Sequence, residues 1–413
     1  MWFYNLGIFF LGLAIKLASL KKEKAKLWVN GRKNWRTILA AKTTKLNTDK
    51  IIWVHCSSYG EFEQGRPVIE AIKKQNLNAK IVLSFYSPSG YEAFKNWDGA
   101  DIVCYLPLDT KQNAKDFLDI VKPTIAIFIK YEFWLNFLFQ LKEKAVPTFL
   151  ISAVFKPHQP FFKWYGGVFK KALSSFKLLL IQDEASGKLL ETISIKNYKV
   201  VGDTRFDRVF DILKTKKDLP LIDAFCANNK ILVAGSSWPK DEEIVIATFK
   251  ILKEKHSSLK LIIAPHEVNK SSVASIEKLM GNLNYTLYTN PTNVEKADVL
   301  IIDTIGILSQ LYRYATATYI GGGFNDGIHN ILEALVYNSP VTFGTNHHKF
   351  IEATESLQLG IAKKILTKDD LISFFDKVIS DDNYRSKLNS DIKNYMQRKS
   401  GATEKILLEI GSI

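Results

Sequence analysis

The sequence predicts an α/β protein with two doubly wound domains, each a parallel sheet covered by helices on both faces. Its 413 residues and hydrophobic content of 46% suffice for two domains of ordinary size with their own cores. Short apolar runs, rich in β-branched or aromatic residues, alternate along the chain with segments of helical spacing. Apolar strands separated by helices are typical of a parallel sheet that is buried on both faces.

The first twenty residues predict a retained membrane anchor. Residues 2–20 are apolar apart from Asn5 and Lys16, and about 20 such residues are needed to span a bilayer. No positive side chain precedes this run and no small-residue cleavage site follows it, which favours an anchor over a secretory signal. Whether it crosses the bilayer or lies in one leaflet is left open, and a buried amphipathic helix is the alternative.

Residues 21–50 form a basic juxtamembrane segment. Residues 1–50 contain nine lysines and two arginines but only two acidic residues, so they carry +9 of the net charge of +14. A basic segment directly after an apolar run favours an anionic membrane surface as its partner and places the rest of the chain on the cytoplasmic side. No basic repeat studded with aromatic residues follows, so we expect no nucleic acid partner. Three widely spaced cysteines indicate a reducing compartment without disulfides or a zinc site.

The strands and helices of the first domain are predicted within residues 51–212. Its strands are expected at 51–56, 80–85, 102–106, 124–129, 147–152 and 178–182, with helices such as 63–75, 111–121 and 133–144 between them. The charged segment 213–220 ends in proline and is the predicted linker. A second domain at 221–413 has expected strands at 231–234, 260–264, 299–303, 316–320 and 341–343, followed by a helical tail from residue 368.

Polar residues follow the strands of the first domain, where ligands of such sheets bind. Ser58, Gly60 and Glu61 follow the strand 51–56, and Glu61 stands near the start of the next helix. The helix dipole stabilises a carboxylate there as the anion, which suits a general base. A simple capping acid is the alternative, and from this residue alone it is the favoured one. Glu132 places a second carboxylate after the strand 124–129.

In the second domain, four strands of one sheet are each followed by small or hydrogen-bonding residues. Ser236 follows the first, His266 the second and Asp303 the third, and the fourth ends in three glycines, Gly321, Gly322 and Gly323. A single such turn means little, but four of them predict a ligand-binding edge. There is no lysine-bearing phosphate loop, GxSxG elbow or catalytic cysteine context, which disfavours kinases and hydrolases.

The glycine block itself suggests a nucleotide-sugar site. Three consecutive glycines let backbone N–H groups approach an anion, and the helix-like run after them adds its N-terminus. Asn330 and Glu333 are three residues apart, so we expect both on one face of that helix near its start. These groups offer main-chain donors for a phosphate and a carboxylate for sugar hydroxyls. An ordinary strand-to-helix turn explains the segment equally well.

Taken in order, these segments resemble the Kdo transferases, the 3-deoxy-D-manno-octulosonic acid transferases of lipopolysaccharide assembly, which have the GT-B fold. The similarity runs nearly end to end. The matching blocks are residues 55–61 (HCSSYGE), 87–90 (SPSG), 132–136 (EFWLN), 202–207 (GDTRFD), 303–312 (DTIGILSQLY) and 321–344. Departures include Pro265, where the family has an arginine before the histidine, and Lys130, where many members have a glutamate.

The resemblance implies an inverting transfer from CMP-Kdo to a lipid A precursor, lipid IVA, by an enzyme anchored at the cytoplasmic face of the inner membrane. Glu61 falls on the family's catalytic base, supported on the acceptor side by Ser58, Gly60 and Glu132. The implied donor-binding residues are Arg205, Ser236, His266, Gly321, Gly322, Gly323, Asn330 and Glu333. Neither a metal ion nor another cofactor is expected, because CMP has no diphosphate for a metal to bridge.

Two other readings stay open. The first is another membrane-associated GT-B enzyme that uses a different nucleotide-activated sugar, such as a UDP-sugar transferase or epimerase. Preference for CMP over UDP in a binding assay separates it from the Kdo transferase. The second is a membrane-bound scaffold without catalysis, which would need neither Glu61 nor the Asn330 and Glu333 pair.

Overall fold

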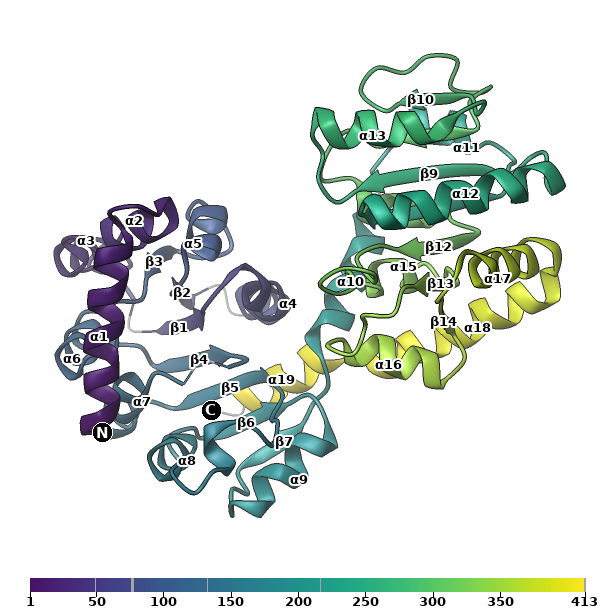
Figure 1. Cartoon of the computed structure of the whole chain (residues 1–413). Coiled ribbons are helices and arrows are strands. Elements are labelled where there is room, and N and C mark those ends of the chain that lie inside the picture. Colours follow the sequence, from purple (N-terminus) through teal and green to yellow (C-terminus); the bar gives the residue numbers. More distant parts are fainter. Residues whose placement is uncertain (49, 76–77, 132, 216, 412–413) are drawn as a thin grey trace. The chain divides into compact units, whose positions relative to one another are not determined.

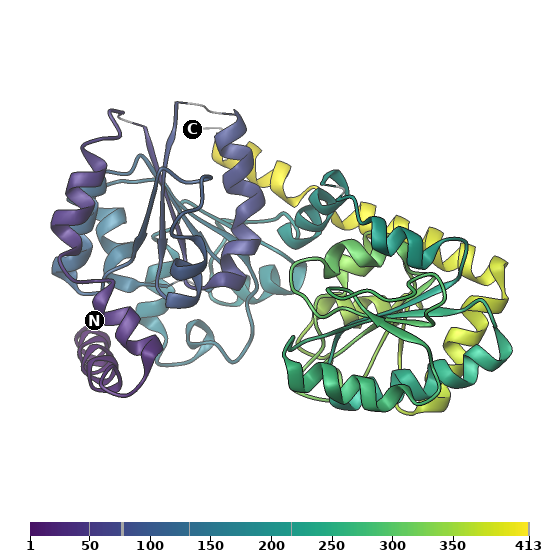
Figure 2. The same ribbon diagram turned by 90° about the horizontal axis from the view of Figure 1, so that it is seen from above.

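The computed structural model describes residues 1–48, 50–75, 78–131, 133–215 and 217–411 (Figure 1). The chain forms two compact units, one of Met1–Arg208 with Lys399–Ile413 and the other of Val209–Arg398. Within the described residues each unit holds a seven-stranded sheet whose strands are all parallel. Helices cover both faces of each sheet (Figure 2). The predicted α/β class with two parallel-sheet domains is confirmed.

The sheet of the first unit, unit 1, has β1 (Ile51–Cys56) at its centre and the order β3-β2-β1-β4-β5-β6-β7. The other strands are β2 (Lys80–Phe85), β3 (Ile102–Tyr105), β4 (Ile125–Ile129), β5 (Thr148–Ala153), β6 (Leu178–Ile181) and β7 (Tyr198–Val200). The order reverses between β1 and β4, and ligands of such sheets bind at the carboxyl ends of the strands at this kind of point. Side chains alternate across β1, where Trp53 is buried in one core and Val54 in the other.

Ten helices of unit 1 are described around this sheet. They are α1 (Trp2–Ala18), α2 (Glu23–Asn30), α3 (Trp35–Thr43), α4 (Tyr59–Gln75), α5 (Pro88–Phe94), α6 (Lys111–Val121), α7 (Leu135–Glu143), α8 (Gly167–Leu173), α9 (Glu184–Thr192) and α19 (Ala402–Gly411), with a 3-10 turn at Pro160–Phe162. The three cysteines form no disulfide.

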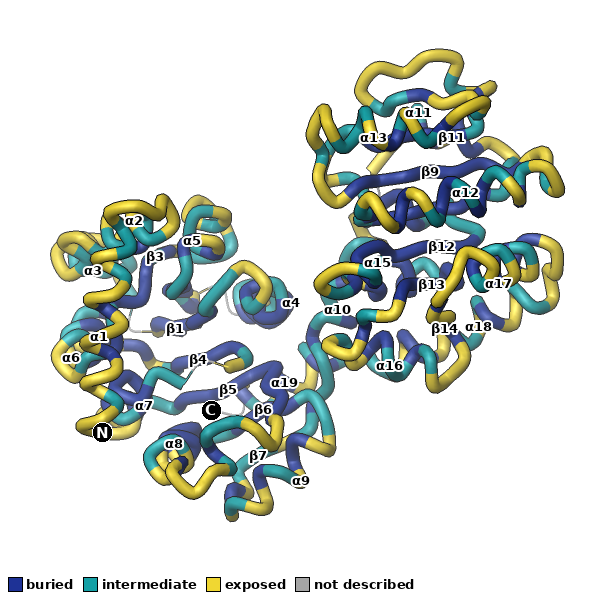
Figure 3. The backbone as a smooth tube through the Cα atoms, in the orientation of Figure 1, coloured by how far each residue is buried: buried dark blue, intermediate teal, exposed yellow. Residues whose placement is uncertain are grey.

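The amino-terminal helix α1 packs one side against unit 1 and exposes apolar side chains on the other. Ile8 and Gly12 are buried, and the Tyr4 hydroxyl donates a hydrogen bond of 2.5 Å to Asp109. Phe9 and Phe10 are 62% and 56% exposed, and the exposed side is visible in Figure 3. Among the described helices none is alone both long and apolar enough to cross a membrane, whereas α1 and α2, bent by 120°, pass that test as a pair.

The last helix, α19, corrects the predicted domain boundaries. Residues 221–413 were expected to form the second domain, but residues from Lys399 onward belong to unit 1. Ile406 and Ile410 are buried in the core that also holds Val54. Asp207 accepts hydrogen bonds of 2.6 Å from the backbone of Gly401 and Thr403, at the start of this helix.

The division between the units also differs from the predicted linker at 213–220. It falls after Arg208, inside α10 (Thr204–Lys214). Phe206 and Val209 on this helix are both buried, 3% and 2% exposed. The helix therefore contributes apolar side chains on both sides of the boundary, which a search for a charged, proline-ended segment does not find.

The second unit, unit 2, has the strand order β10-β11-β9-β8-β12-β13-β14. Its strands are β8 (Ile231–Ser237), β9 (Lys260–Pro265), β10 (Tyr285–Leu287), β11 (Val299–Ile301), β12 (Ala317–Ile320), β13 (Val341–Phe343) and β14 (Ala362–Lys364). Its helices are α11 (Pro220–Cys226), α12 (Pro239–Lys255), α13 (Lys270–Met280), α14 (Leu308–Leu311), α15 (Leu332–Leu335), α16 (Ile351–Gln358), α17 (Lys368–Ser380) and α18 (Asp382–Lys399), with a 3-10 turn at Tyr312–Tyr314. Here the order reverses between β8 and β12, so the loops after these two strands occupy the corresponding position in unit 2.

Candidate active site

Glu61 lies in the first turn of α4, the helix that follows β1. Ser58 donates a hydrogen bond of 2.9 Å to Glu61 Oε2. Both side chains are half-buried, whereas Gly60 is exposed, and a Cβ added at Gly60 would meet no atom within 4 Å. The structure thus brings together Ser58, Gly60 and Glu61, with open space next to the Gly60 backbone. Glu132, the other carboxylate expected at this edge, lies outside the described residues.

Tyr131 and Arg205 share the edge with Glu61. The pKa of the Tyr131 hydroxyl is raised, first by burial and then by the negative charges of Asp183 and Glu61, while Arg205 lowers it. Arg205 itself forms an ion pair of 2.7 Å with Asp203. Arg205 was predicted with the donor-binding residues, but it belongs to unit 1, whereas Ser236, His266 and the glycine block belong to unit 2.

A buried histidine of β1, His55, connects this strand and β2 with the segment after β4. Trp134 Nε1 donates a hydrogen bond of 3.0 Å to His55 Nε2, so this nitrogen is the unprotonated one. His55 Nδ1 then donates to the backbone oxygen of Ser84, 3.1 Å away. His55 and Trp134 belong to two of the blocks that carry the family resemblance, and their contact holds the segment after β4 against the end of β1.

An apolar pocket of about 370 Å³ lies beside this edge. It is lined by Tyr4 and Ile8 of α1, by Tyr131, Phe133 and Trp134 after β4, and by aromatic residues of the segment 159–169. Tyr131 and Trp134 therefore border both the Glu61 edge and the pocket. The sequence analysis did not find this pocket, because it forms from three segments that are distant in the chain.

In unit 2, Asp241 organises the turn that follows β12. Its Oδ2 accepts hydrogen bonds from the backbone of Gly322 (2.8 Å) and Trp238 (3.0 Å), and its Oδ1 accepts one from the Tyr319 hydroxyl (2.6 Å). Asp241 is buried, with 1% of its surface exposed. The sequence signal for this residue is modest, since an acidic residue in the first turn of a helix is usually a simple cap.

The three glycines allow backbone segments to pack directly on one another. A Cβ added at Gly321 would lie 2.2 Å from the Ser236 oxygen, and one at Gly323 would lie 2.5 Å from the Gly344 nitrogen. Gly322 has a φ of +90°, which disfavours any side chain. The N–H of Gly321 donates to Gly235 and that of Gly322 to Asp241. Within the described part of the chain, the N–H of Gly323 has no acceptor.

Three aromatic rings stack at the same edge of unit 2. Trp238 and His266 lie with ring centroids 4.6 Å apart, and His266 and His329 with centroids 4.4 Å apart. Burial, and then the neighbouring charge of His266, lower the pKa of His329. Ser236 precedes this stack with a φ of +52°, a conformation that L-residues seldom adopt. The predicted residues Ser236 and His266 therefore lie near the end of β12, and Trp238 and His329 lie next to them.

Asn330 and Glu333 are adjacent, but not on the helix that was expected. The Asn330 Nδ2 donates a hydrogen bond of 3.2 Å to Glu333 Oε1, and its Oδ1 accepts one from the backbone of Leu332. Asn330 precedes α15, which has only four residues. A single turn adds little macrodipole, so anion binding by this helix N-terminus stays a prediction, and the side-chain pair is the feature that the structure shows.

A buried glutamate lies next to this edge. Glu242 accepts a hydrogen bond of 3.1 Å from Ser237 and lines a pocket of about 260 Å³ together with Trp238 and Glu267. Burial raises the pKa of Glu242 to about 7, and the Ser237 hydroxyl opposes this shift. Across the residues that the structure describes, no cluster of three or more His, Cys, Asp or Glu side chains could hold a metal ion.

Comparison with known proteins shows which family this chain is similar to. Residues 33–208 match the family model described as 3-deoxy-D-manno-octulosonic-acid transferase (kdotransferase). The chain is 28% identical to the 3-deoxy-D-manno-octulosonic acid transferase of Aquifex aeolicus, over 82% of this chain and 89% of that protein. It is 23% identical to the enzyme of the same name from Rickettsia prowazekii, over 98% of this chain and 88% of that protein.

Solved structures show the fold. UDP-GlcNAc 2-epimerase from Neisseria meningitidis, bound to UDP-GlcNAc, matches with a TM-score of 0.62 and 17% identity over 87% of this chain and 98% of that one. MurG from Acinetobacter baumannii matches with a TM-score of 0.55 and 10% identity, over 88% of this chain and all of that one (100%). At these identities the likeness concerns the two-domain α/β fold alone.

Proposed function

Since this chain belongs to the Kdo transferase family and is a glycosyltransferase, we propose that it transfers Kdo from CMP-Kdo to a lipid A precursor, lipid IVA. The observation that carries the proposal is the position of Glu61. It lies in the first turn of the helix after β1, where Ser58 holds it and the adjacent residue Gly60 has open space next to its backbone. An apolar pocket that suits a lipid lies next to the same edge.

The proposed reaction is a direct displacement with inversion. The acceptor's primary hydroxyl oxygen attacks the anomeric carbon of Kdo, and Glu61 takes the proton of that hydroxyl. A new C–O bond forms while the bond from the anomeric carbon to the phosphate oxygen breaks, and CMP leaves with the electron pair. Ser58 orients the Glu61 carboxylate through Oε2. General-base catalysis of this kind contributes about 10²–10⁴-fold in rate.

We assign the nucleotide to the edge of unit 2. The Gly323 N–H is the main-chain donor proposed for the phosphate, with His266 and His329 as the neighbouring rings. The Asn330 and Glu333 pair offers an amide and a carboxylate to the ribose hydroxyls. Arg205 lies with Glu61 and Tyr131 in unit 1, so its proposed contact is the carboxylate of the sugar that reacts there.

The acceptor and the membrane are assigned to unit 1. An acyl chain of the lipid fits the chemistry of the pocket between α1 and the segment after β4, whose lining is largely aromatic. The exposed apolar side of α1 and the basic residues 21–50 suit an anionic membrane surface. We therefore propose that the enzyme works at the cytoplasmic face of the inner membrane, with α1 lying in the interface.

One departure from the family pattern favours a second candidate. Pro265 stands where the family carries an arginine before the histidine, which removes one cation next to His266. A donor with a different nucleotide or a less anionic sugar would need that cation less. Another nucleotide-activated sugar is therefore the alternative donor.

The proposal is tested by CMP release from purified protein in detergent. Release is expected only when CMP-Kdo and lipid IVA are both present, and it should persist in EDTA because no metal is assigned a role. Titration calorimetry with CMP and UDP identifies the nucleotide, and CMP should bind more tightly. Tighter UDP binding without CMP release would transfer the assignment to the alternative donor.

A further inference from the structure

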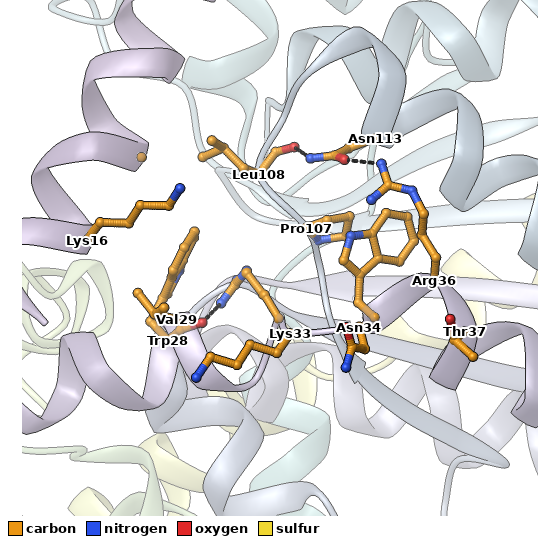
Figure 4. Close-up of a pocket in the computed structure, with 13 residues that line it drawn as sticks. Lys16, Trp28, Val29, Lys33, Asn34, Arg36, Thr37, Pro107, Leu108 and Asn113 are labelled. Carbon is orange, nitrogen blue, oxygen red and sulfur yellow. Dashed lines mark hydrogen bonds between the residues drawn. The ribbon is translucent and has the colours of Figure 1, made fainter.

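A second pocket of unit 1, of about 560 Å³, lies between α1, the α2–α3 segment and the loop after β3 (Figure 4). Four basic residues line it, namely Lys16, Arg32, Lys33 and Arg36, together with the indoles of Trp28 and Trp35. Its lining contains no carboxylate. This volume is typical of a small-molecule site, and its charge selects for an anion.

Two of the four cations are available to a ligand. Lys16 and Lys33 are exposed, and within the described residues neither ammonium has a hydrogen-bond or ion-pair partner. Figure 4 shows the Lys16 side chain extending from α1 toward the centre of the pocket. Arg36 is partly neutralised, because its Nε lies 2.6 Å from Asp116 and its Nη2 donates to Asn113.

Arg32 fixes a positive charge in the wall of the pocket. Its guanidinium donates to the backbone oxygens of Leu106, Trp28 and Tyr86 at 2.7–3.0 Å, and it stacks 3.7 Å from the centre of the Trp28 ring. Burial lowers its pKa to about 9, so it remains charged at neutral pH. Its acceptors are carbonyls, and no carboxylate of the described residues balances this charge.

The pocket lies beside the exposed apolar side of α1. Lys16 lies one helical turn after Gly12, and Gly12 packs on Leu108 at the edge of the pocket. Leu13 and Leu17 of the same helix are exposed. A helix that lies in the interface buries its apolar side among acyl chains, and the residues flanking that side meet the headgroups. Lysine side chains are long enough to reach phosphates at this depth.

We propose that this pocket binds the phosphate headgroup of one anionic membrane lipid, with Lys16 and Lys33 as its ligands and Arg32 as a fixed charge. The inference rests on the proposed membrane association and is independent of the donor and of Glu61. It converts a diffuse attraction between residues 21–50 and the membrane into a discrete site. The bound lipid would hold α1 and α2 at the surface from which the acceptor enters.

The test compares two pairs of lysines in the full-length protein. Lys16→Gln with Lys33→Gln removes two pocket charges, and Lys21→Gln with Lys24→Gln removes two exposed charges of the same segment that do not line the pocket. Each protein is titrated by calorimetry with dihexanoyl phosphatidic acid below its micelle concentration. One site per chain is expected, weakened at least tenfold in the pocket pair and less than threefold in the control pair.

Three results would overturn the inference. If both lysine pairs weaken lipid binding equally, the attraction is diffuse. If inorganic phosphate binds as tightly as the lipid, the pocket is a site for free anions. If the wild-type protein does not bind the lipid, the site does not exist. Circular dichroism and the melting temperature establish that the variants are folded. CMP release by the wild-type protein, measured in parallel, separates failure of this site from failure of the transferase proposal.

Discussion

In the first turn of α12, Asp241 joins its own helix start, β12 and the glycine turn through its two carboxylate oxygens. Gly322 and Trp238 donate backbone hydrogen bonds to one oxygen, and Tyr319 donates its hydroxyl to the other. All three groups donate hydrogen bonds to Asp241, so this buried position requires a side chain that only accepts them. The glycine turn is therefore held by a residue outside the glycine motif.

We expect Asp241→Asn to weaken both the turn and the binding of CMP. The asparagine NH₂ would face a buried donor, and a buried donor without an acceptor costs about 1–3 kcal/mol of stability. The Kd for CMP should rise about tenfold in calorimetry, and the melting temperature should fall. The control is Asp369→Asn, an exposed acid in the first turn of α17. Unchanged CMP affinity in Asp241→Asn would show that the glycine turn does not contribute to nucleotide binding.

Glu242 should give unit 2 a pH-dependent stability. Its pKa in the folded protein is about 7, above its ordinary value of 4.5, because it is buried. The stability it contributes is complete below about pH 4.5 and is lost as the pH rises through 7. Glu242→Gln does not titrate, so the loss of stability between pH 5 and 8 should shrink by about 1–2 kcal/mol.

Chemical denaturation followed by a probe in unit 2 measures this difference, with Glu254→Gln on the same helix as the exposed control. An unchanged pH profile in Glu242→Gln would show that this carboxyl titrates normally in the folded protein.

Among the elements, α1 divides its surface between the protein and an apolar exposed side. Tyr4, Ile8 and Gly12 face unit 1, while Phe9 and Phe10 are exposed. An aromatic side chain buried in an apolar medium contributes about 1.5–3 kcal/mol. Phe9→Ser with Phe10→Ser should therefore weaken vesicle binding at least a hundredfold without lowering the melting temperature.

Sedimentation with anionic vesicles measures this binding. Leu359→Ser with Leu366→Ser removes two exposed apolar side chains of unit 2 as the control. Wild-type binding by the α1 variant would show that this helix is not the membrane-facing element.

Most strands were predictable, but the short edge strands β7, β10 and β14 and the loops between strands were not. Runs such as Ile51–Cys56 and Lys80–Phe85 were predicted at their observed bounds. Short, nearly continuous apolar runs are typical of strands that are buried on both faces of a parallel sheet. The expected helix around residue 330 is reduced to the four residues of α15, although apolar spacing extends beyond it. Ile331, Leu332 and Leu335 are buried as a helix would require, but Asn338 adopts a positive φ of 60° and the chain turns away.

At the scale of the whole molecule, chain order does not decide which unit a segment joins. The sequence predicts that the tail is helical, and it is, but α19 packs with unit 1. Apolar periodicity shows that a helix has a buried side without showing what covers it. Ser58, Ser236 and His266 lie at strand ends because parallel sheets place the residues that follow their strands there. The role of Asp241 depends on tertiary contacts that no motif records.

Ile406→Ala should accordingly destabilise unit 1 although residue 406 is near the end of the chain. Ile406 is fully buried in a core with Val54 and Phe62, and truncating such a side chain costs about 2–5 kcal/mol. Hydrogen exchange should quicken in β1 and α4, with little change in β8 and β12. Leu408→Ala on the same helix, at a position 67% exposed, is the control. Faster exchange confined to unit 2 would contradict this assignment of α19.

The central claim, that Glu61 is the base of a Kdo transfer, is tested most directly by mass spectrometry of the acceptor. Lipid IVA is incubated with CMP-Kdo and the wild-type protein, Glu61→Gln, or Glu70→Gln, a control on the same helix whose carboxylate pairs with Arg66. We expect a mass gain of one or more Kdo units with the wild type and the control. Glu61→Gln should lose about 10²–10⁴-fold in rate while still binding CMP. Transfer by Glu61→Gln at the wild-type rate, or no mass gain with the wild type, would contradict the claim.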